Sequence, residues 1–186
     1  MPDLAAAWKF LEESDPIASA QEVEAAIARL AQEISEELRK AYPVILVVMG
    51  GAVVFAGQLL PRLRFPLDFD YVHVTRYGAA TEGARIDWRV APPAGVQGRA
   101  VLVLDDILDG GQTMLAIREE LRALGAASFQ CAVLVEKTLA RAKPISADFV
   151  GLRIPDRFVF GCGMDAKGYW RNLPEIRAMK DRQQSV

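Results

Sequence analysis

The 186-residue sequence predicts an α/β fold in which helices flank a mostly parallel central sheet. Several short apolar runs are rich in β-branched residues, which is typical of strands buried on both faces of a parallel sheet. The segments between these runs carry apolar residues at helical spacing. Alternating strands and helices of this kind pack as a sheet with helices on its faces. Ligands of such proteins bind beyond the carboxyl ends of the strands, so the loops there form the candidate site.

The first helix is expected from about residue 20 to 40. Residues 19–22 read S-x-x-E, a capping-box pattern, and apolar residues then recur at spacings of three and four. The run Pro43–Met49 predicts a strand buried on both faces. Two glycines, Gly50 and Gly51, interrupt it, and the apolar positions in residues 53–63 predict a helix that closes this unit.

A hairpin excursion is expected next. Residues 68–76 predict a strand, residues 77–84 a surface loop rich in Gly and Ala, and residues 86–90 a returning strand. Proline and glycine in residues 92–98 predict a turn before the next strand.

The clearest strand–helix unit follows this turn. Residues 99–104 predict an apolar strand, residues 105–111 an acidic loop that contains glycine, and residues 113–124 a helix with one apolar face. The later strands are expected at 129–135, 148–154 and 158–162.

Composition excludes several classes of function. The formal net charge is −2 and both signs are spread along the chain, so no basic block predicts a nucleic-acid surface. No apolar stretch is long enough to span a membrane, and residues 1–10 lack the pattern of a secretory signal. Cys131 and Cys162 lie in apolar runs and are expected to be buried free thiols in a reducing cytoplasm. The single histidine, His73, is interpreted as structural because one histidine cannot build a His-rich metal site.

The acidic loop carries the strongest chemical signal. Asp105, Asp106 and Asp109 follow a buried strand, and two glycines then open a helix. Glycines let backbone amides approach an anion, and a helix N-terminus favours negative charge, so residues 109–113 predict a phosphate cradle. The preceding carboxylates suit sugar hydroxyls or a magnesium ion. The alternative is a solvated turn that Asp109 caps, and the sequence lacks a P-loop or a G-x-G-x-x-G fingerprint at this turn.

Two separate segments, in this order, resemble a known family. Residues 101–113 resemble the ribose-phosphate signature of the type I phosphoribosyltransferases. Residues 148–161, followed by Met164 and Asp165, resemble the purine-binding region of the hypoxanthine-guanine phosphoribosyltransferases. The resemblance runs from about residue 22 to 173. It implies a Rossmann-like core at about residues 20–150 and a small hood, made of about residues 150–186 and the N-terminal segment, within one domain of residues 1–186.

The resemblance also implies roles in the acidic loop. Asp109 would be the general base beside purine N7, and Asp105 and Asp106 would hold the ribose hydroxyls. The backbone amides of the next four residues would hold the 5′-phosphate. These four residues are Gly110, Gly111, Gln112 and Thr113.

Further residues would bind the base and the pyrophosphate. Lys137 would contact the purine 6-oxygen, since a protonated amine favours a carbonyl oxygen over an amino group. Phe158 would stack on the purine, and the Val159 backbone would read its edge. Asp165 would hold Mg²⁺. The pyrophosphate would be received by Arg171, Gly50 and Gly51, and Tyr77 would close over the site as part of a lid at residues 76–85.

The implied reaction is transfer of the 5-phosphoribosyl group from phosphoribosyl pyrophosphate to hypoxanthine, guanine or both. The products would be IMP or GMP and pyrophosphate. The partners would then be a 6-oxopurine base, phosphoribosyl pyrophosphate and further copies of the chain in a dimer or tetramer, without nucleic acid or membrane. Two alternatives stay open: a regulator that senses phosphoribosyl pyrophosphate on the same fold, and a transferase that prefers xanthine.

The sequence departs from the usual family pattern at several positions. The customary Glu-Asp pair is replaced by Asp105 and Asp106, and the usual Thr-Gly-Lys is replaced by Gly110, Gly111 and Gln112. A basic residue in the pyrophosphate loop is replaced by Met49. Because these changes remove charges and a hydroxyl near the phosphates, they are expected to affect affinity more than reaction type.

Overall fold

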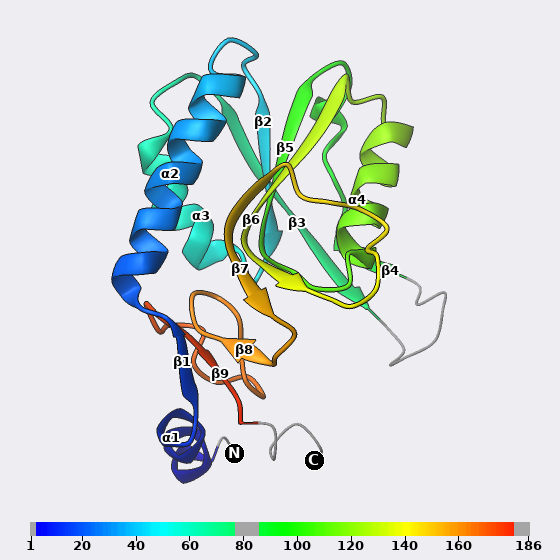
Figure 1. Ribbon diagram of the computed structural model, residues 1–186. Coiled ribbons are helices and arrows are strands. Elements are labelled where there is room, and N and C mark those ends of the chain that lie inside the picture. Colours follow the sequence, from blue (N-terminus) through cyan, green and yellow to red (C-terminus); the bar gives the residue numbers. More distant parts are fainter. Residues whose placement is uncertain (1–2, 77–85, 181–186) are drawn as a thin grey trace.

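A computed structural model of the chain describes residues 3–76 and 86–180 (Figure 1). Within these residues six strands form a sheet of order β4-β3-β2-β5-β6-β7. All neighbouring strands run parallel except β3 and β4, which form an antiparallel pair. The bounds are β2 Val44–Met49, β3 Asp68–Arg76, β4 Ile86–Val90, β5 Ala100–Leu108, β6 Ser128–Thr138 and β7 Phe149–Pro155.

Helices cover both faces of this sheet (Figure 1). The helices α2 (Ala20–Leu38) and α3 (Val53–Leu59), the latter continued by a 3₁₀ turn at Leu60–Arg62, bury their apolar residues against one face. The helix α4 (Gln112–Ala123) packs on the other face, and a 3₁₀ turn at Ala94–Val96 precedes β5. Two apolar cores therefore lie on opposite sides of one sheet, which is the layering that the sequence predicts.

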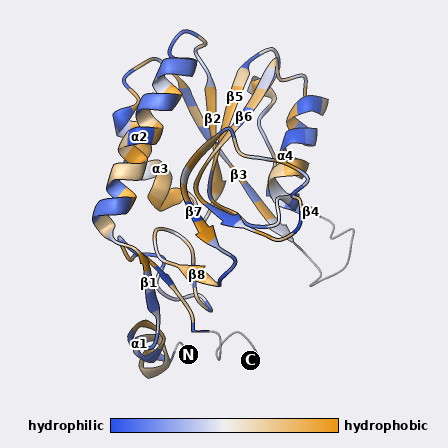
Figure 2. Cartoon of the chain, in the orientation of Figure 1, coloured by the Kyte–Doolittle hydropathy of each residue, from blue (hydrophilic) through white to orange (hydrophobic). Residues whose placement is uncertain are grey.

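Local sequence explains the main elements. Ser19 and Glu22 form the capping box at the start of α2, and each side chain bonds the backbone of the other residue. In β2, residues 44–48 are buried without alternation, as expected of a central parallel strand. In Figure 2 the central strands β2, β5 and β6 are largely apolar, whereas α2 carries both apolar and hydrophilic residues.

A small second sheet lies beyond the carboxyl ends of the large one (Figure 1). It has the order β1-β9-β8, and its strands are Asp15–Ala18, Ile176–Ala178 and Val159–Phe160. The helix α1 (Leu4–Glu12) packs beside it, because Phe10 and Leu11 join a core cluster with Phe160. The two ends of the described chain therefore meet in one small structure.

Most predicted elements are confirmed, with three differences. The strand β5 continues to Leu108 and β6 to Thr138, so Asp105, Asp106 and Lys137 belong to strands and not to loops. The strand ladder explains this, because β5 and β6 stay paired up to Leu108 opposite Glu136. The sequence analysis also did not predict α1, β1 or β9. The predicted loop 77–84 lies outside the described residues. In the part of the chain that the structure covers, no helix combines the length and apolarity needed to cross a membrane.

Candidate active site

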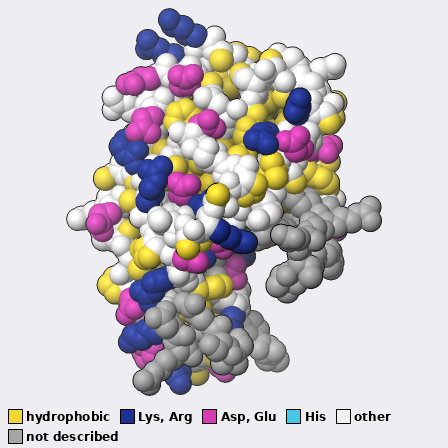
Figure 3. Space-filling view, turned by 45° about the vertical axis from the view of Figure 1, so that its right-hand side comes forward, with side chains coloured by type: hydrophobic (Ala, Val, Ile, Leu, Met, Phe, Trp, Pro, Cys, Tyr) yellow, Lys and Arg dark blue, Asp and Glu magenta, His cyan; other side chains and the backbone are white. Residues whose placement is uncertain are grey.

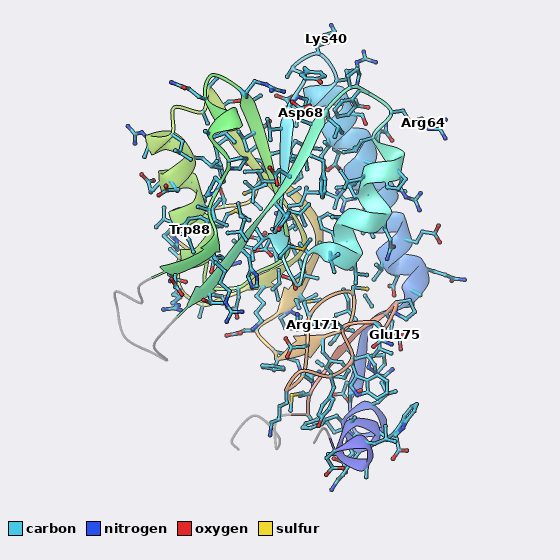
Figure 4. The ribbon with its side chains drawn as sticks, turned by 180° about the vertical axis from the view of Figure 1, so that it is seen from behind. Lys40, Arg64, Asp68, Trp88, Arg171 and Glu175 are labelled. Carbon is cyan, nitrogen blue, oxygen red and sulfur yellow. The ribbon has the colours of Figure 1, made fainter. Side chains whose placement is uncertain are left out.

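The predicted site residues gather at the carboxyl end of the large sheet. The strands β2, β5 and β6 are parallel neighbours, so Met49, Leu108 and Thr138 end at the same edge. Arg171 lies at the junction between this edge and the small sheet (Figure 4). Figure 3 shows Lys or Arg side chains beside Asp or Glu side chains where the large upper part of the molecule meets the small lower part.

The start of α4 is shaped to receive an anion. Gly111 occupies the N-cap position with a positive φ of 85°, and no side chain caps the helix. The backbone amides in the first turn of α4 therefore have no side-chain acceptor. Backbone amides at a helix N-terminus that are left in this way can bind a phosphate group. A pocket of about 230 Å³ opens here and is lined by residues 105–111, Thr113 and Met114. Because Asp109 does not cap α4, the interpretation of this segment as a simple capped turn is wrong.

Gly110 and Gly111 have different surroundings. A Cβ on Gly111 would meet Pro144 and Ile145 at 3.3 Å, and the positive φ disfavours any side chain there. A Cβ on Gly110 would lie 2.5 Å from Oε1 of Gln112, whose side chain folds back over it. The exposed Gln112 and the half-buried Thr113 complete the first turn of the helix.

Asp106 is a buried carboxylate that the backbone of the Met49–Gly51 loop touches. It is only 8% exposed, and burial raises the pKa of its carboxyl group although a hydrogen bond from Asp105 opposes this. Gly51 passes so close that a Cβ there would lie 1.9 Å from Asp106 Oδ2. Its exposed neighbour Gly50 has open space around it. The Met49–Gly51 loop and the acidic end of β5 are therefore packed together.

Lys137 extends toward the acidic residues. Its Nζ lies 3.1 Å from Asp109 Oδ2 and 3.6 Å from Asp156 Oδ1, and its side chain is 11% exposed. The preceding residue, Glu136, instead pairs with Lys143 and Arg153. The side chain of Lys137 therefore points toward Asp109, whereas the side chain of Glu136 points away from Asp109.

The segment at residues 156–159, which was expected to bind a purine, presents one exposed ring. Phe158 is 44% exposed, whereas the next residue, Val159, is buried in β8. Arg157 turns away from this ring, because its Nη2 lies 2.6 Å from Asp15 Oδ2 and donates to the Met179 carbonyl at 2.9 Å. A free aromatic face beside a fixed backbone edge suits a flat base.

Asp165 and Arg171 form an ion pair in the segment that follows. Arg171 Nη2 lies 2.5 Å from Asp165 Oδ1, and its Nη1 donates to the Gly163 carbonyl at 2.6 Å. A Cβ on Gly163, whose φ is 103°, would lie 1.8 Å from the Gly51 carbonyl oxygen. This segment therefore packs directly against the Met49–Gly51 loop.

Comparisons with known proteins identify the family of the chain. Residues 13–167 match the phosphoribosyl transferase domain family. The chain belongs to the phosphoribosyltransferase family. Among relatives, the hypoxanthine-guanine phosphoribosyltransferase of Bacillus subtilis is 32% identical over 163 residues, 87% of this chain and 91% of that protein. The enzyme of the same name from Streptococcus pneumoniae is 30% identical over 167 residues, 89% of this chain and 92% of that protein.

Solved phosphoribosyltransferase structures share the fold. The crystal structure of a hypoxanthine phosphoribosyltransferase from Staphylococcus aureus superposes with a TM-score of 0.83 at 25% identity and covers 95% of this chain and 97% of its own. The predicted α/β fold with a mostly parallel sheet is thereby confirmed.

The candidate site has no self-contained metal cage in the described residues. No group of three or more His, Cys, Asp and Glu is arranged there to hold a metal ion. Asp165 offers a partly exposed carboxylate, 31% exposed, and it already accepts from Gly168 N at 2.6 Å. One protein carboxylate fits Mg²⁺, which takes one or two of them and fills its other positions with water and substrate phosphates.

Three residues that shape the candidate site were not predicted from the sequence. Asp156 is the second carboxylate beside Lys137, and it stands in the Pro-Asp-Arg-Phe run that carries the resemblance. Gly163 contacts the Met49–Gly51 loop, and the Gly-Cys-Gly run around it was a usable signal. Lys143 bonds the strand ends, and nothing in its local sequence indicates this. Tyr77 and the side chain of Arg76 lie outside the described residues.

Proposed function

We propose that the chain is a purine salvage enzyme that transfers the 5-phosphoribosyl group from phosphoribosyl pyrophosphate to hypoxanthine or guanine. The products are IMP or GMP and pyrophosphate. The observation that carries the proposal is the position of Lys137. Its ammonium group lies 3.1 Å from Asp109 on the same sheet edge as the phosphate cradle. The names of the relatives from Bacillus subtilis and Streptococcus pneumoniae support the same reaction.

The proposed base site combines one cation, two carboxylates and one ring. Lys137 donates to the 6-oxygen of the purine, and Phe158 stacks on its face. The 6-amino group of adenine is a hydrogen-bond donor and would face the Lys137 ammonium, which is also a donor. The site therefore favours 6-oxopurines. Asp156 also pairs with Lys137, so the ammonium keeps an anionic neighbour while Asp109 takes part in the reaction.

The proposed phosphoribosyl site uses the acidic strand end and the helix start. The amides of residues 110–113 hold the 5′-phosphate, since no side chain caps α4. Asp105 and Asp106 accept hydrogen bonds from the ribose hydroxyls. Gly50, Gly51 and Arg171 receive the pyrophosphate, for which Arg171 must exchange its present partner Asp165.

The transfer then needs one nucleophilic attack and one proton movement. Purine N9 attacks ribose C1′, the C1′–O bond to pyrophosphate breaks, and the electron pair leaves with the pyrophosphate oxygen. Asp109 accepts the proton from purine N7 as the ring becomes electron-poor. The carboxylates around the ribose stabilise the positive charge that develops at C1′.

The proposed metal ion is Mg²⁺, and Asp165 would hold it. Phosphoribosyl transfer generally uses a divalent metal ion, which neutralises pyrophosphate and makes it a better leaving group. Asp165 is placed to exchange the guanidinium of Arg171 for such an ion, because both interactions use the same carboxylate.

We further propose one domain over residues 1–186, with a core at about 20–150. The hood, at about 150–186 plus the N-terminal segment, would cover the purine. The antiparallel pairing of β1 with β9 supports a single unit, since it joins the two ends of the chain.

We also propose that the chain works in the cytoplasm as a dimer or tetramer. Cys131 and Cys162 are free and buried, and burial raises their pKa to about 12 and about 11, which suits stable thiols in a reducing compartment. Val53 on α3 and Phe69 and Tyr71 on β3 are large apolar side chains that the single chain leaves exposed, and a second copy would cover them. Sedimentation velocity measures the oligomeric state, and a monomer at working concentration would contradict the assembly.

A competition assay tests the proposed function. Purified protein receives Mg²⁺, phosphoribosyl pyrophosphate and one of hypoxanthine, guanine, xanthine or adenine, and pyrophosphate release is measured. We expect release with hypoxanthine, guanine or both and little with adenine. Binding of phosphoribosyl pyrophosphate without release for any base would indicate a sensing regulator. A clear preference for xanthine would instead identify the alternative transferase.

A further inference from the structure

Lys143 lies behind the proposed site, on the connection between β6 and β7. Its Nζ donates to the Lys137 carbonyl at 2.6 Å and to the Leu108 carbonyl at 3.0 Å, and it lies 3.4 Å from Glu136 Oε1. Only 11% of the side chain is exposed. One ammonium group therefore joins the ends of two strands and a carboxylate.

The two carbonyls belong to the segments that carry the proposed chemistry. Leu108 ends β5 and immediately precedes Asp109, while Lys137, near the end of β6, is the residue proposed to donate to the purine. The pairing of β5 with β6 extends to Leu108 opposite Glu136, and Asp109 and Lys137 follow these two residues. Lys143 thus bonds the two strands at the last paired position, where sheet hydrogen bonds cease to fix their separation.

The charge of Lys143 is compensated within the same cluster. Glu136 is 16% exposed and contacts both Lys143 and Arg153 Nε, the latter at 3.2 Å. Shielded ion pairs of this kind often add little net stability, because desolvation offsets their attraction. The three contacts of Lys143 instead fix the relative position of the two strand ends. Asp109 as a base and Lys137 as a specificity residue both require such a fixed position.

We infer that Lys143 is a positioning residue that sets the separation of Asp109 and Lys137. It does not touch the substrate, and it acts through the carbonyls of Leu108 and Lys137. The inference rests on the proposed function, since Asp109 and Lys137 are assigned their roles there.

The test compares the wild type with Lys143→Met, which keeps the apolar stem and removes the ammonium group. Lys143→Arg is the rescue variant, because its guanidinium can still donate to both carbonyls. The matched control is Arg141→Met, which removes an exposed cation from the same connection. Each protein is measured for kcat and for KM with hypoxanthine and with phosphoribosyl pyrophosphate. Amide hydrogen exchange is recorded without ligands.

For Lys143→Met we expect kcat/KM for hypoxanthine to fall about 10- to 100-fold, the usual effect of a small misplacement of reacting groups. The KM for hypoxanthine should rise, whereas the KM for phosphoribosyl pyrophosphate should stay close to wild type. A KM does not depend on the fraction of active enzyme, so partial unfolding cannot produce this contrast. Exchange should increase at residues 107–110 and 136–139, Lys143→Arg should restore most of the loss, and Arg141→Met should match wild type.

Several results would overturn the inference. Unchanged exchange at the strand ends, or an unchanged KM for hypoxanthine in an active enzyme, would remove the positioning role. Failure of Lys143→Met to fold would assign Lys143 to stability and would also remove the positioning role. A wild type that is inactive with every base would refute the proposed function. The exchange data would then decide by themselves whether Lys143 joins the strand ends.

Discussion

Replacing Gly51 with alanine should disable the ribose site while leaving most of the fold intact. The new Cβ would lie 1.9 Å from Asp106 Oδ2 and 2.6 Å from Asp106 Cγ. Ordinary carbon contacts need roughly 3.5 Å, so the shortfall exceeds about 1 Å. The loop has little room to retreat, because Gly163 also packs closely against it: a Cβ on Gly163 would lie 1.8 Å from the Gly51 carbonyl oxygen. The Asp106 carboxylate must therefore move.

A shift of about 1 Å at a substrate-binding group typically costs about 100-fold in rate. We expect Gly51→Ala to lower kcat/KM for phosphoribosyl pyrophosphate by about that factor. The free energy of unfolding should fall by roughly 1–3 kcal/mol, the usual cost of overpacking. Pyrophosphate release at varied phosphoribosyl pyrophosphate, together with thermal melting, measures both effects.

Gly57→Ala is the control for this substitution. Gly57 lies in α3, shortly after the loop, and a Cβ there has nothing within 4 Å. We expect wild-type kinetics and a gain of about 0.5–1 kcal/mol, since alanine is the better helix former. Wild-type kinetics for Gly51→Ala would refute the reasoning, because the tight contact between Gly51 and Asp106 would then be irrelevant to the substrate.

Three further substitutions test individual roles. Asp109→Asn should lower kcat about 10²- to 10⁴-fold with little change in binding of phosphoribosyl pyrophosphate, as measured by turnover and calorimetry, and wild-type turnover would exclude it as the base. Lys137→Ala should weaken hypoxanthine and guanine selectively, so an unchanged preference over adenine in competition assays would place base selection elsewhere. Burial raises the pKa of Asp106, so the folded wild type loses stability as pH rises from the unfolded-state pKa, about 3.9, through the higher folded-state pKa. Asp106→Asn should therefore melt at a higher temperature than wild type near neutral pH and lose this advantage in acid, and equal melting curves at every pH would show that the carboxylate carries no burial penalty.

Periodicity predicted the elements that bury a continuous apolar surface. The capping box at Ser19, the apolar stripe of α2 and the run of β2 specify their structures locally, and their boundaries agree closely with the structure. The acidic segment after β5 was recognised as chemically unusual from its residues alone. Its backbone was predicted less well, because Asp105 and Asp106 suggest a loop, whereas the paired strand β6 keeps them in the sheet.

Contacts between distant segments could not be read from local patterns. The strand β9 has three residues and pairs with β1 across most of the chain, so its apolar pattern is too short to indicate a strand. Asp156 and Lys143 shape the candidate site through contacts with residues distant in sequence: Asp156 contacts Lys137, and Lys143 bonds the Leu108 carbonyl. From the sequence, Lys137 could be predicted as a site residue only through the family resemblance. The structure shows that Lys137 pairs with Asp109, whereas its neighbour Glu136 pairs with Lys143.

The small sheet has a consequence for how the protein matures during synthesis. Its middle strand, β9, is formed by residues 176–178, close to the end of the 186-residue chain, and lies between β1 and β8. Because a chain folds from the N-terminus as it is made, the large sheet can form while β1 still lacks its partner strand β9. The small sheet can close only after residues 176–178 have left the ribosome. Stop codons a few residues before 176 would leave the large sheet complete and the small one without its central strand.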